Sequence, residues 1–550
     1  MAKKKKKFKQ RATTDFKNSG YSEGGASRTN NILKSWAPIK LSAKSDIDAN
    51  LYTLRNRAAD MSINTPIGAS AINTSVTHTV GAGLAVNPRP KINILGIDAA
   101  AAREWTRRTK EEFNLWASTV DCDICRRNNF LDLQHIAYVS YLTDGDSFAL
   151  FRRKPPTPRN PYTLRIQLLE ANRVCNPLDG SVIGVFPYSV EAMSKNGNRI
   201  VSGIEINNDG EIVAYHISNR VPNDFLGREE LTKWVRVEAF GKLAGLPNVL
   251  QVCHDTRPDQ FRGVPYLAPV IETLKQTSRY TTAELASAIV KSFFSLFFVQ
   301  KESNHTLDDM MSDAGLDIKK KKDDPDRPVA DVTEYNLGPG TMNALPKGVD
   351  VKAVDSGKAQ STFAPFTQEL VKQIGAALGQ PYEVLMKSFT ASYSASRAAL
   401  LQAFAEYKQR RIWFARDFCQ PIYETWLIEA VASGRIEAPG FFDDPLIRAA
   451  WSNAEWFGPA MSILDPEKDA LGSSLRVQQG LSTNQREAAE MTGTDYEENL
   501  EILAYETELK RELMPKPEVE ENGTADSDDN IDSDDDTEVE ENVHQRTDNG

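Results

Sequence analysis

Two long stretches of helical pattern constrain this fold most. The first, residues 266–298, is about 33 residues, or roughly 50 Å, long, and its segment "TTAELASAIVKSFFSLFF" mixes small with large apolar residues. The second lies in residues 385–418, which begin as a hydroxyl-rich loop and enter a helix without glycine or proline. Its apolar residues follow one broad stripe: Leu400, Phe404, Tyr407, Phe414 and Phe418. Helices with more than one apolar face need long helical partners, either within the chain or from neighbouring copies.

Residues 147–252 change to a period of about two. Apolar and polar residues alternate in segments such as "LRIQLLE", and Asn208-Asp209-Gly210 is typical of a hairpin turn. Helical patterns precede this region at residues 49–80, restarting at Pro66, and at 99–118 and 129–142. The sequence therefore predicts an α+β fold in which a mostly antiparallel sheet packs on helices.

The second half of the chain is mostly helical by pattern. A helix is expected over residues 361–378, and the helix after the hydroxyl-rich loop is expected to continue through a kink at Pro421 to Ser433. Residues 441–466 are predicted to be irregular, and residues 466–513 to form a helical pair. Short strands are expected after the Lys/Asp-dense insertion at residues 301–331.

The net charge of −11 is concentrated at the ends. Residues 515–550 hold 14 acids and 2 bases, whereas residues 3–11 supply seven positive charges. Such charge-segregated tails cannot bury enough apolar surface to offset chain entropy, so we expect disorder, with simple solvation as the plainest role. The body between them is slightly acidic, which is unlike a basic DNA-binding domain.

Five cysteines, an odd and small number, argue for a reducing compartment rather than a disulfide framework. No apolar segment follows the lysine-rich start as in a secretory signal, and the run Ser292 to Val299 is too short to cross a bilayer. We expect a soluble protein that does not contact membranes.

Patterns for catalysis or metal binding are weak. Cys122 and Cys125 have the spacing of half a zinc site, but no second ligand pair follows. "GDSF", starting at Gly145, suggests a serine hydrolase, with Asp132 and His135 as partners, yet such hydrolases place this pair far downstream. No phosphate-binding G-x-x-x-x-G-K-[ST] motif occurs. The sequence predicts a protein that is not an enzyme and needs no cofactor or metal.

Several blocks, in order over roughly residues 50–490, together resemble the lambda-type tailed-bacteriophage portal proteins. They include "LYTLRNRAADMSINTPIGASAINTSVTHTVGAGL", "FLDLQHIAYVSYLTDGDSFALF", "PDQFRGVPYLAPVIETLKQTSRYTTAEL", "FAPFTQELVKQIGAALGQPYEVL", "SYSASRAALLQAF" and "ILDPEKDA". Each block alone is weak, but the series is specific.

The resemblance implies a ring, commonly of twelve subunits, at one vertex of the capsid. Viral DNA is packaged and ejected through its channel. The implied partners are double-stranded DNA without sequence specificity, the terminase large subunit, head-completion or connector proteins, and the major capsid and scaffold proteins. The location would be the virion, after assembly in the host cytoplasm.

The resemblance also implies a division of the chain. Its expected parts are a basic disordered arm (1–29), a wing (30–262), a stem helix (263–298), a clip (299–352), a return stem helix (353–383), a tunnel loop (384–394), a tunnel-side helix of the wing (395–439), a crown (440–514) and an acidic disordered tail (515–550). The clip lysines Lys319, Lys320, Lys321 and Lys322 would contact the packaging motor, or would simply be a solvated loop.

The hydroxyl-rich loop suits a DNA channel on physical grounds. Its candidate contact residues are Lys387, Ser388, Thr390, Ser392 and Ser394. A channel that passes any sequence cannot read bases, and many cations would hold the phosphates too tightly for movement. The alternative is an ordinary surface loop in which Ser394 or Ser396 caps the next helix. Rivals from other classes are a DNA-packaging enzyme of the terminase kind and a capsid shell or scaffold protein.

Overall fold

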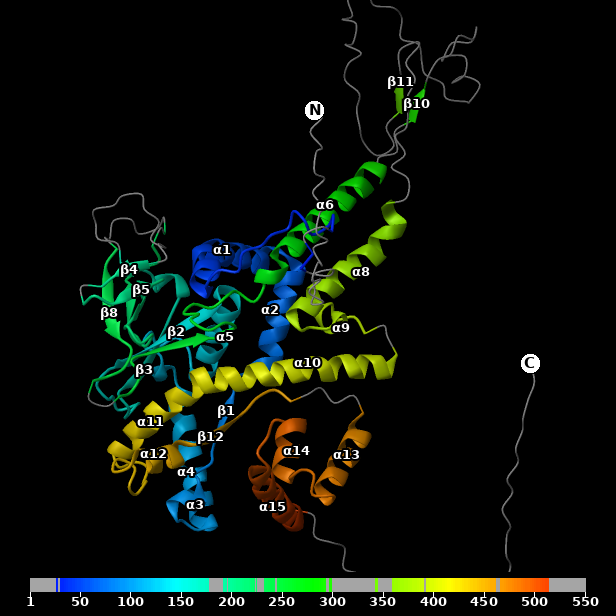
Figure 1. Cartoon of the computed structure of the whole chain (residues 1–550). Helices are drawn as coiled ribbons and strands as arrows, with labels where there is room; N and C mark the ends of the chain where they lie inside the picture. Colours follow the sequence, from blue (N-terminus) through cyan, green and yellow to red (C-terminus); the bar gives the residue numbers. More distant parts are fainter. Residues whose placement is uncertain are drawn as a thin grey trace, which may run out of the picture. The chain divides into compact units, whose positions relative to one another are not determined.

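The computed structural model describes residues 26–27, 30–177, 191–194, 196–222, 224, 232–242, 245–292, 296–298, 342–344, 359–389, 392–460 and 465–513. The chain divides into two compact units, residues 1–494 and 495–550. Every element before α15 belongs to the first unit (Figure 1). Within the described residues, no helix is long and apolar enough to cross a membrane.

Helices open the first unit, as the sequence predicts. A π-helical turn, η1 (Lys44–Asp48), leads into α1 (Ala49–Asn64), and α2 (Pro66–Thr79) restarts at the predicted proline. The Thr65 hydroxyl accepts from Gly68 N at 3.3 Å, so the break between the helices is capped. The strand β1 (Ala85–Pro88), the short α3 (Ile92–Leu95), α4 (Ala99–Ala117), η2 (Val120–Cys122) and α5 (Phe130–Asp144) follow.

The predicted antiparallel strands form two sheets among the described residues. One has the order β3-β2-β9, built from β2 (Asp146–Arg153), β3 (Leu164–Leu169) and β9 (Val249–Cys253). The other runs in sequence order through β4 (Glu191–Met193), β5 (Arg199–Val201), β6 (Ile204–Ile206), β7 (Ile212–Ser218) and β8 (Trp234–Glu238). The predicted hairpin joins β6 to β7, and Gly210 there takes a left-handed φ of 87°.

The first long helix is shorter than the sequence predicts. A turn at residues 266–267 and the 3₁₀ helix η4 (Ala268–Val270) precede α6, which spans Ile271–Ser292 rather than 266–298. The aromatic-rich end of the predicted helix instead forms β10 (Leu296–Phe298), which pairs in parallel with β11 (Met342–Ala344). Aromatic residues favour a pleated surface, which explains the error. The chain returns as α8 (Ala359–Leu378), close to the predicted 361–378.

A nearly continuous helical rod follows α8. After the short α9 (Tyr382–Leu385), α10 (Tyr393–Phe414) passes through the π-helical turn η5 (Ala415–Cys419) into α11 (Gln420–Ala432). Pro421 lies at the start of α11, where its missing N–H costs little. The predicted continuation to Ser433 is confirmed, and the irregularity lies in the π-helical turn just before the proline.

Two predictions for the last quarter are wrong. Residues 441–466 are not irregular throughout, because α12 (Pro445–Ser452) and β12 (Ala454–Phe457) form there, and β12 pairs antiparallel with β1. The partner strand is more than 360 residues away, so no local pattern could reveal the pairing. The predicted helical pair is three helices: α13 (Pro466–Gln478), α14 (Asn484–Met491) and α15 (Tyr496–Leu513).

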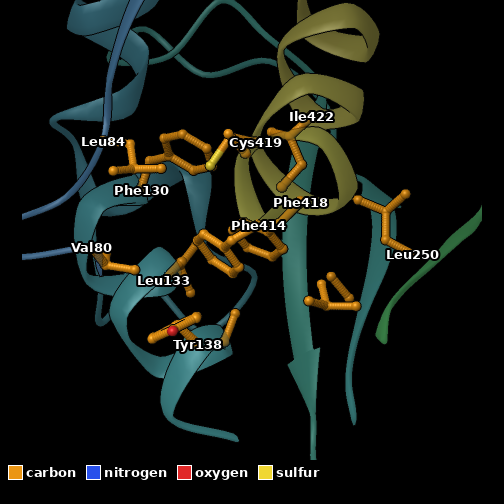
Figure 2. Packing of buried hydrophobic residues seen from close by; sticks show 14 of the residues in the cluster. Val80, Leu84, Phe130, Leu133, Tyr138, Leu250, Phe414, Phe418, Cys419 and Ile422 are labelled. Carbon is orange, nitrogen blue, oxygen red and sulfur yellow. The ribbon is translucent and has the colours of Figure 1, made fainter. Parts of the chain in front are cut away.

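Aromatic residues from both halves of the chain form the main core. Figure 2 shows Phe414, Phe418, Cys419 and Ile422 of the rod packed against Phe130, Leu133 and Tyr138 of α5 and against Leu84 and Leu250. Phe418 stacks on Phe130 with ring centroids 6.2 Å apart, and on Phe414 at 5.2 Å. The rod is therefore anchored in the helix and sheet layers through its second half.

Candidate nucleic-acid interface

The hydroxyl-rich loop lies between α9 and α10, at the free end of the rod (Figure 1). Lys387 takes a left-handed φ of 53°, which is uncommon for a residue other than glycine. Its N–H contacts Val384 O at 3.4 Å, and Ser388 N donates to Glu383 O at 3.0 Å. These bonds fold the chain back over α9, and Lys387 itself is exposed.

Large apolar side chains share this loop with the predicted polar ones. Met386 is 41% exposed and Phe389 is 52% exposed. Ser388 is half-buried, whereas Ser392 and Ser394 are exposed. Thr390 lies outside the described residues. The loop therefore presents the side chains of Met386 and Phe389 beside its lysine. Neither was among the contact residues predicted from the sequence.

The serine-cap alternative is wrong in its position. The N-cap residue of α10 is Ser392, and its side chain makes no capping hydrogen bond. Ser394 and Ser396 both lie inside the helix, and Ser396 N already donates to Ser392 O at 2.9 Å. Ser394 therefore does not cap the helix, and its side chain is exposed.

The base of the loop is packed and hydrogen-bonded to its neighbours. Val384 of α9 packs with Ala403 and Tyr407 of α10. Ser70 of α2 donates through its hydroxyl to Leu385 O at 2.7 Å. Gln380, which is almost fully buried, donates to Ala71 O at 2.9 Å. The loop is thus held between α2, α8 and α10.

The cations of α10 are engaged inside the chain. Arg397 pairs with Asp469 at 2.5 Å, Lys408 with Glu490 at 2.5 Å, and Arg410 with Glu406 at 2.8 Å. Arg411 donates to the carbonyls of His78, Thr79 and Pro459, and burial lowers its pKa to about 10. A basic helix by sequence is therefore largely neutralised by its own fold, and does not offer a dense row of cations to phosphates.

The two long helices α6 and α8 lie side by side and extend away from the sheets (Figure 1). Tyr280 of α6 lies between two aromatic rings of α8, 5.5 Å from Phe363 and 5.2 Å from Phe366. Leu285 and Ile289 of α6 and Phe366 of α8 are roughly half exposed. These apolar side chains leave a surface suited to a further protein contact.

A buried charge cluster, missed at the level of sequence, fixes the root of α6. Asp146 at the start of β2 accepts from Arg55 Nη2 of α1 at 2.7 Å and from Arg262 Nε at 2.6 Å. All three side chains have almost no solvent access. Arg262 also donates to the carbonyls of Val174, Ser202 and Ala171. Asp146 lies in the block "TDGDSF" and Arg262 in the block "FRGVP". No local pattern indicated that these two residues meet.

The backbone beside this cluster is equally tight. A Cβ placed on Gly263 would lie 1.8 Å from Gly145 O. Gly145 also has a left-handed φ of 88°, where it ends α5. Glycine is required at both positions, so that the segment leading to α6 can cross the start of β2.

A cavity of about 610 Å³ lies along the rod, between α10, α11, β12 and α14. Phe404, Ile412 and Trp456 give it an apolar lining, and Lys408, Arg411, Arg416 and Arg486 border it. Its acids include Glu424, whose pKa is raised by burial. No nucleophile with an adjacent base faces this cavity among its lining residues.

The weak catalytic and metal patterns have structural explanations. Asp132 closes a capping box with Asn129, and Ser147 is buried in β2. Cys122 is buried, and that burial raises the pKa of its thiol to about 12, while Cys125 is exposed. Over the described part of the chain, no group of three or more His, Cys, Asp or Glu could hold a metal ion. The four clip lysines lie outside the described residues.

Comparison with known proteins gives a consistent result. A family model described as phage portal protein, lambda family, matches residues 29–411. The chain is 23% identical over 509 residues to portal protein B of Escherichia phage lambda, covering 90% of this chain and 91% of that protein. It is 25% identical over 503 residues to the portal protein of Escherichia phage N15, covering 87% and 88%.

A solved structure described as the neck of a native GTA particle, computed with C12 symmetry, also resembles the chain. The match covers 80% of this chain and 92% of the chain in that structure, at 11% identity and a TM-score of 0.36. A likeness of this size adds nothing to the family match.

Proposed function

The chain belongs to the lambda family of phage portal proteins, and from this premise we propose that its copies close into a ring around a DNA channel. The protein is a portal protein, and this family is structural rather than catalytic. In the proposal, double-stranded DNA enters the capsid through the ring during packaging and leaves by it during ejection.

The observation that carries the proposal is the placement of the hydroxyl-rich loop. The short α9 contacts both α8 and α10, so the loop lies where the end of the α6–α8 pair meets the free end of the rod (Figure 1). Copies arranged with their α6–α8 pairs around an axis would bring these loops together at the bore. The exposed side chains of Leu285, Ile289 and Phe366 would then be covered by neighbouring copies.

The chemistry of the loop supports passage rather than grip. Lys387 gives one exposed cation per copy, with Ser392 and Ser394 as exposed hydroxyls. The rod contributes few further charges because Arg397, Lys408 and Arg410 pair with acids of the same chain. Weak contacts repeated around a ring exchange easily as the duplex moves, whereas dense phosphate neutralisation would bind it strongly.

The division of the chain stays a proposal for its finer parts. Residues 30–262 would form the wing, residues 263–298 and 353–383 the two stem helices, and residues 440–514 a crown facing the capsid interior. Residues 299–352 would form the clip that meets the terminase large subunit and then the connector proteins. The capsid and scaffold proteins would contact the outside of a ring of twelve copies.

Native mass spectrometry and negative-stain microscopy of the purified full chain test the ring. We expect one closed species with a central pore and no ATPase activity. A stable monomer at micromolar concentration, or lattices in place of rings, would contradict the proposal. ATP hydrolysis by the purified chain would favour a packaging enzyme.

The clip contact needs its own test. Replacing Lys319, Lys320, Lys321 and Lys322 by serine should slow binding of the packaging motor, mainly at low salt, because rim charges act on association rate. Unchanged binding at low salt would assign these lysines to solvation alone.

A further inference from the structure

The helix α15, in the second compact unit, carries large apolar side chains that are exposed. None of its residues is buried. Six large apolar side chains are between 38% and 73% exposed: Leu500, Ile502, Leu503, Tyr505, Leu509 and Leu513. An 18-residue helix in a protein depends for its stability on packing of such a face. A partner surface is therefore expected.

These side chains form two separate stripes. With successive residues about 100° apart around the axis, Leu500 and Leu503 share one side, here named stripe A. Ile502, Tyr505, Leu509 and Leu513 share another, stripe B, whose centre is roughly 145° from that of stripe A. Polar residues separate the two stripes on both sides. A helix buried against one partner needs one stripe, whereas two nearly opposite stripes suit a helix placed between two neighbours.

The charges beside the stripes differ in sign. Lys510 and Arg511, the basic residues of α15, lie on either side of stripe A, each roughly 50° from its centre. Glu506 and Glu512 lie on either side of stripe B. Contact of A with B places opposite charges together, whereas A with A, or B with B, places like charges together.

We propose that α15 of each copy packs its stripe A against stripe B of α15 in the next copy, so that the helices form a closed collar. The inference rests on the proposed ring. A contact between two different faces is heterologous, and such contacts generate rings when the rotation closes. The occupant of each stripe is thus a second copy of this chain, and both apolar stripes of every helix become covered.

Disulfide crosslinking of the full-length protein tests this contact. Leu503 of stripe A and Tyr505 of stripe B differ in height by only about 3 Å but face opposite ways, so cysteines there cannot bridge within one helix. The double variant Leu503→Cys/Tyr505→Cys should therefore give, on mild oxidation, a ladder of covalent oligomers extending to the ring number. The matched control, Leu503→Cys/Glu508→Cys, moves the second cysteine out of stripe B to a glutamate position between the two stripes. The unmodified chain reports the background from the native cysteines.

The results separate the collar from the ring itself. A ladder in the first variant but not in the control or in Leu503→Cys alone supports the collar. Dimers from Leu503→Cys alone would overturn it, because A would then meet A. Closed rings that give no ladder above background would also overturn it, and would mean that α15 is covered by its own chain or by a different protein. A monomeric unmodified chain would remove the ring and the collar together.

Discussion

The guanidinium of Arg262 donates two hydrogen bonds to the carboxylate of Asp146, from Nε to Oδ2 at 2.6 Å and from Nη2 to Oδ1 at 3.2 Å. Asp146 is also bound by Arg55, so one acid balances two buried cations. The cluster joins α1, β2 and the segment that enters α6. Asp146 therefore ties the segment that enters α6 to β2 and α1.

Removing that carboxylate should destabilise the first unit strongly. We expect Asp146→Ala to cost about 3–5 kcal/mol, because it leaves two buried guanidinium groups without the carboxylate that they bond directly. Urea unfolding followed by tryptophan fluorescence measures the change. Asp209→Ala, in the exposed hairpin turn, is the matched control and should change stability by less than about 0.5 kcal/mol. Equal midpoints for the two variants would show that the cluster does not carry the stability assigned to it.

The glycine crossing gives a second test. Gly263→Ala should prevent correct folding, since its methyl group would meet Gly145 O at 1.8 Å. Gly241→Ala is the control, because Leu246 O, the nearest atom to a Cβ at that position, would lie at an ordinary 3.6 Å. Soluble yield and thermal midpoint should fall for the first variant alone. A Gly263→Ala protein that melts with the unmodified chain would refute the close approach.

Stability should depend on pH through Asp48. Burial raises the pKa of Asp48 to about 6, although the Arg262 and Arg55 guanidinium groups oppose the shift. The folded state then holds a proton that the unfolded state releases, so the contribution of Asp48 is greatest below about pH 4 and is lost as the pH rises through 6. Asp48→Asn removes this titration. The stability difference between the variant and the unmodified protein should therefore change between pH 4 and 7, in favour of the variant at higher pH. A difference that stays constant over this range would contradict the raised pKa.

Ring assembly should respond to the outer face of α6. Leu285 is 60% exposed, so Leu285→Glu should leave the subunit folded but reduce the yield of rings by placing a charge in the contact. Native mass spectrometry measures the loss, and circular dichroism checks the fold. The control, Glu284→Gln, changes the neighbouring residue without adding a charge. Normal ring yield from Leu285→Glu would place this face outside the contact between copies.

DNA movement should respond to the charge at Lys387. Lys387→Glu reverses one charge per copy in the loop, and we expect slower packaging or shorter packaged DNA, more so at low salt where screening is weakest. Ring yield should stay normal, because Lys387 is exposed.

The control for that experiment is Lys91→Glu, which reverses the charge of another exposed lysine. Rings that carry Lys91→Glu should package DNA normally. Packaging at the normal rate by Lys387→Glu rings at low salt would remove the electrostatic basis of the loop assignment. Failure of Lys387→Glu to form rings would instead place the lysine in a contact between copies.

Local patterns predicted the elements that local chemistry determines. Pro66 restarts a helix because proline suits a first turn, and Gly210 closes a hairpin because it accepts a positive φ. The helix predicted at 361–378, which the structure has at 359–378, and the apolar stripe ending at Phe418 were found for the same reason, since period alone identifies them.

What the sequence did not reveal depends on distant partners. The strand β12 exists because β1 pairs with it, and β10 replaces the end of a predicted helix because β11 lies beside it. Asp146 looked like part of a catalytic motif until Arg55 and Arg262 were seen around it. For the candidate loop, the hydroxyls were visible in sequence, but the exposure of Phe389 and the internal pairing of the α10 cations required the fold.

The π-helical turn at Ala415–Cys419 leaves α10 and α11 joined as a single rod of about 60 Å. One end of this rod bears the loop, and the other is fixed among Phe130, Tyr423 and Trp426. A force on the loop is therefore carried along the rod to this aromatic core, as well as to α2 and α9, which contact α10 nearer the loop. If the loop lines a DNA channel, its resistance to the moving duplex would depend partly on a core far from that channel.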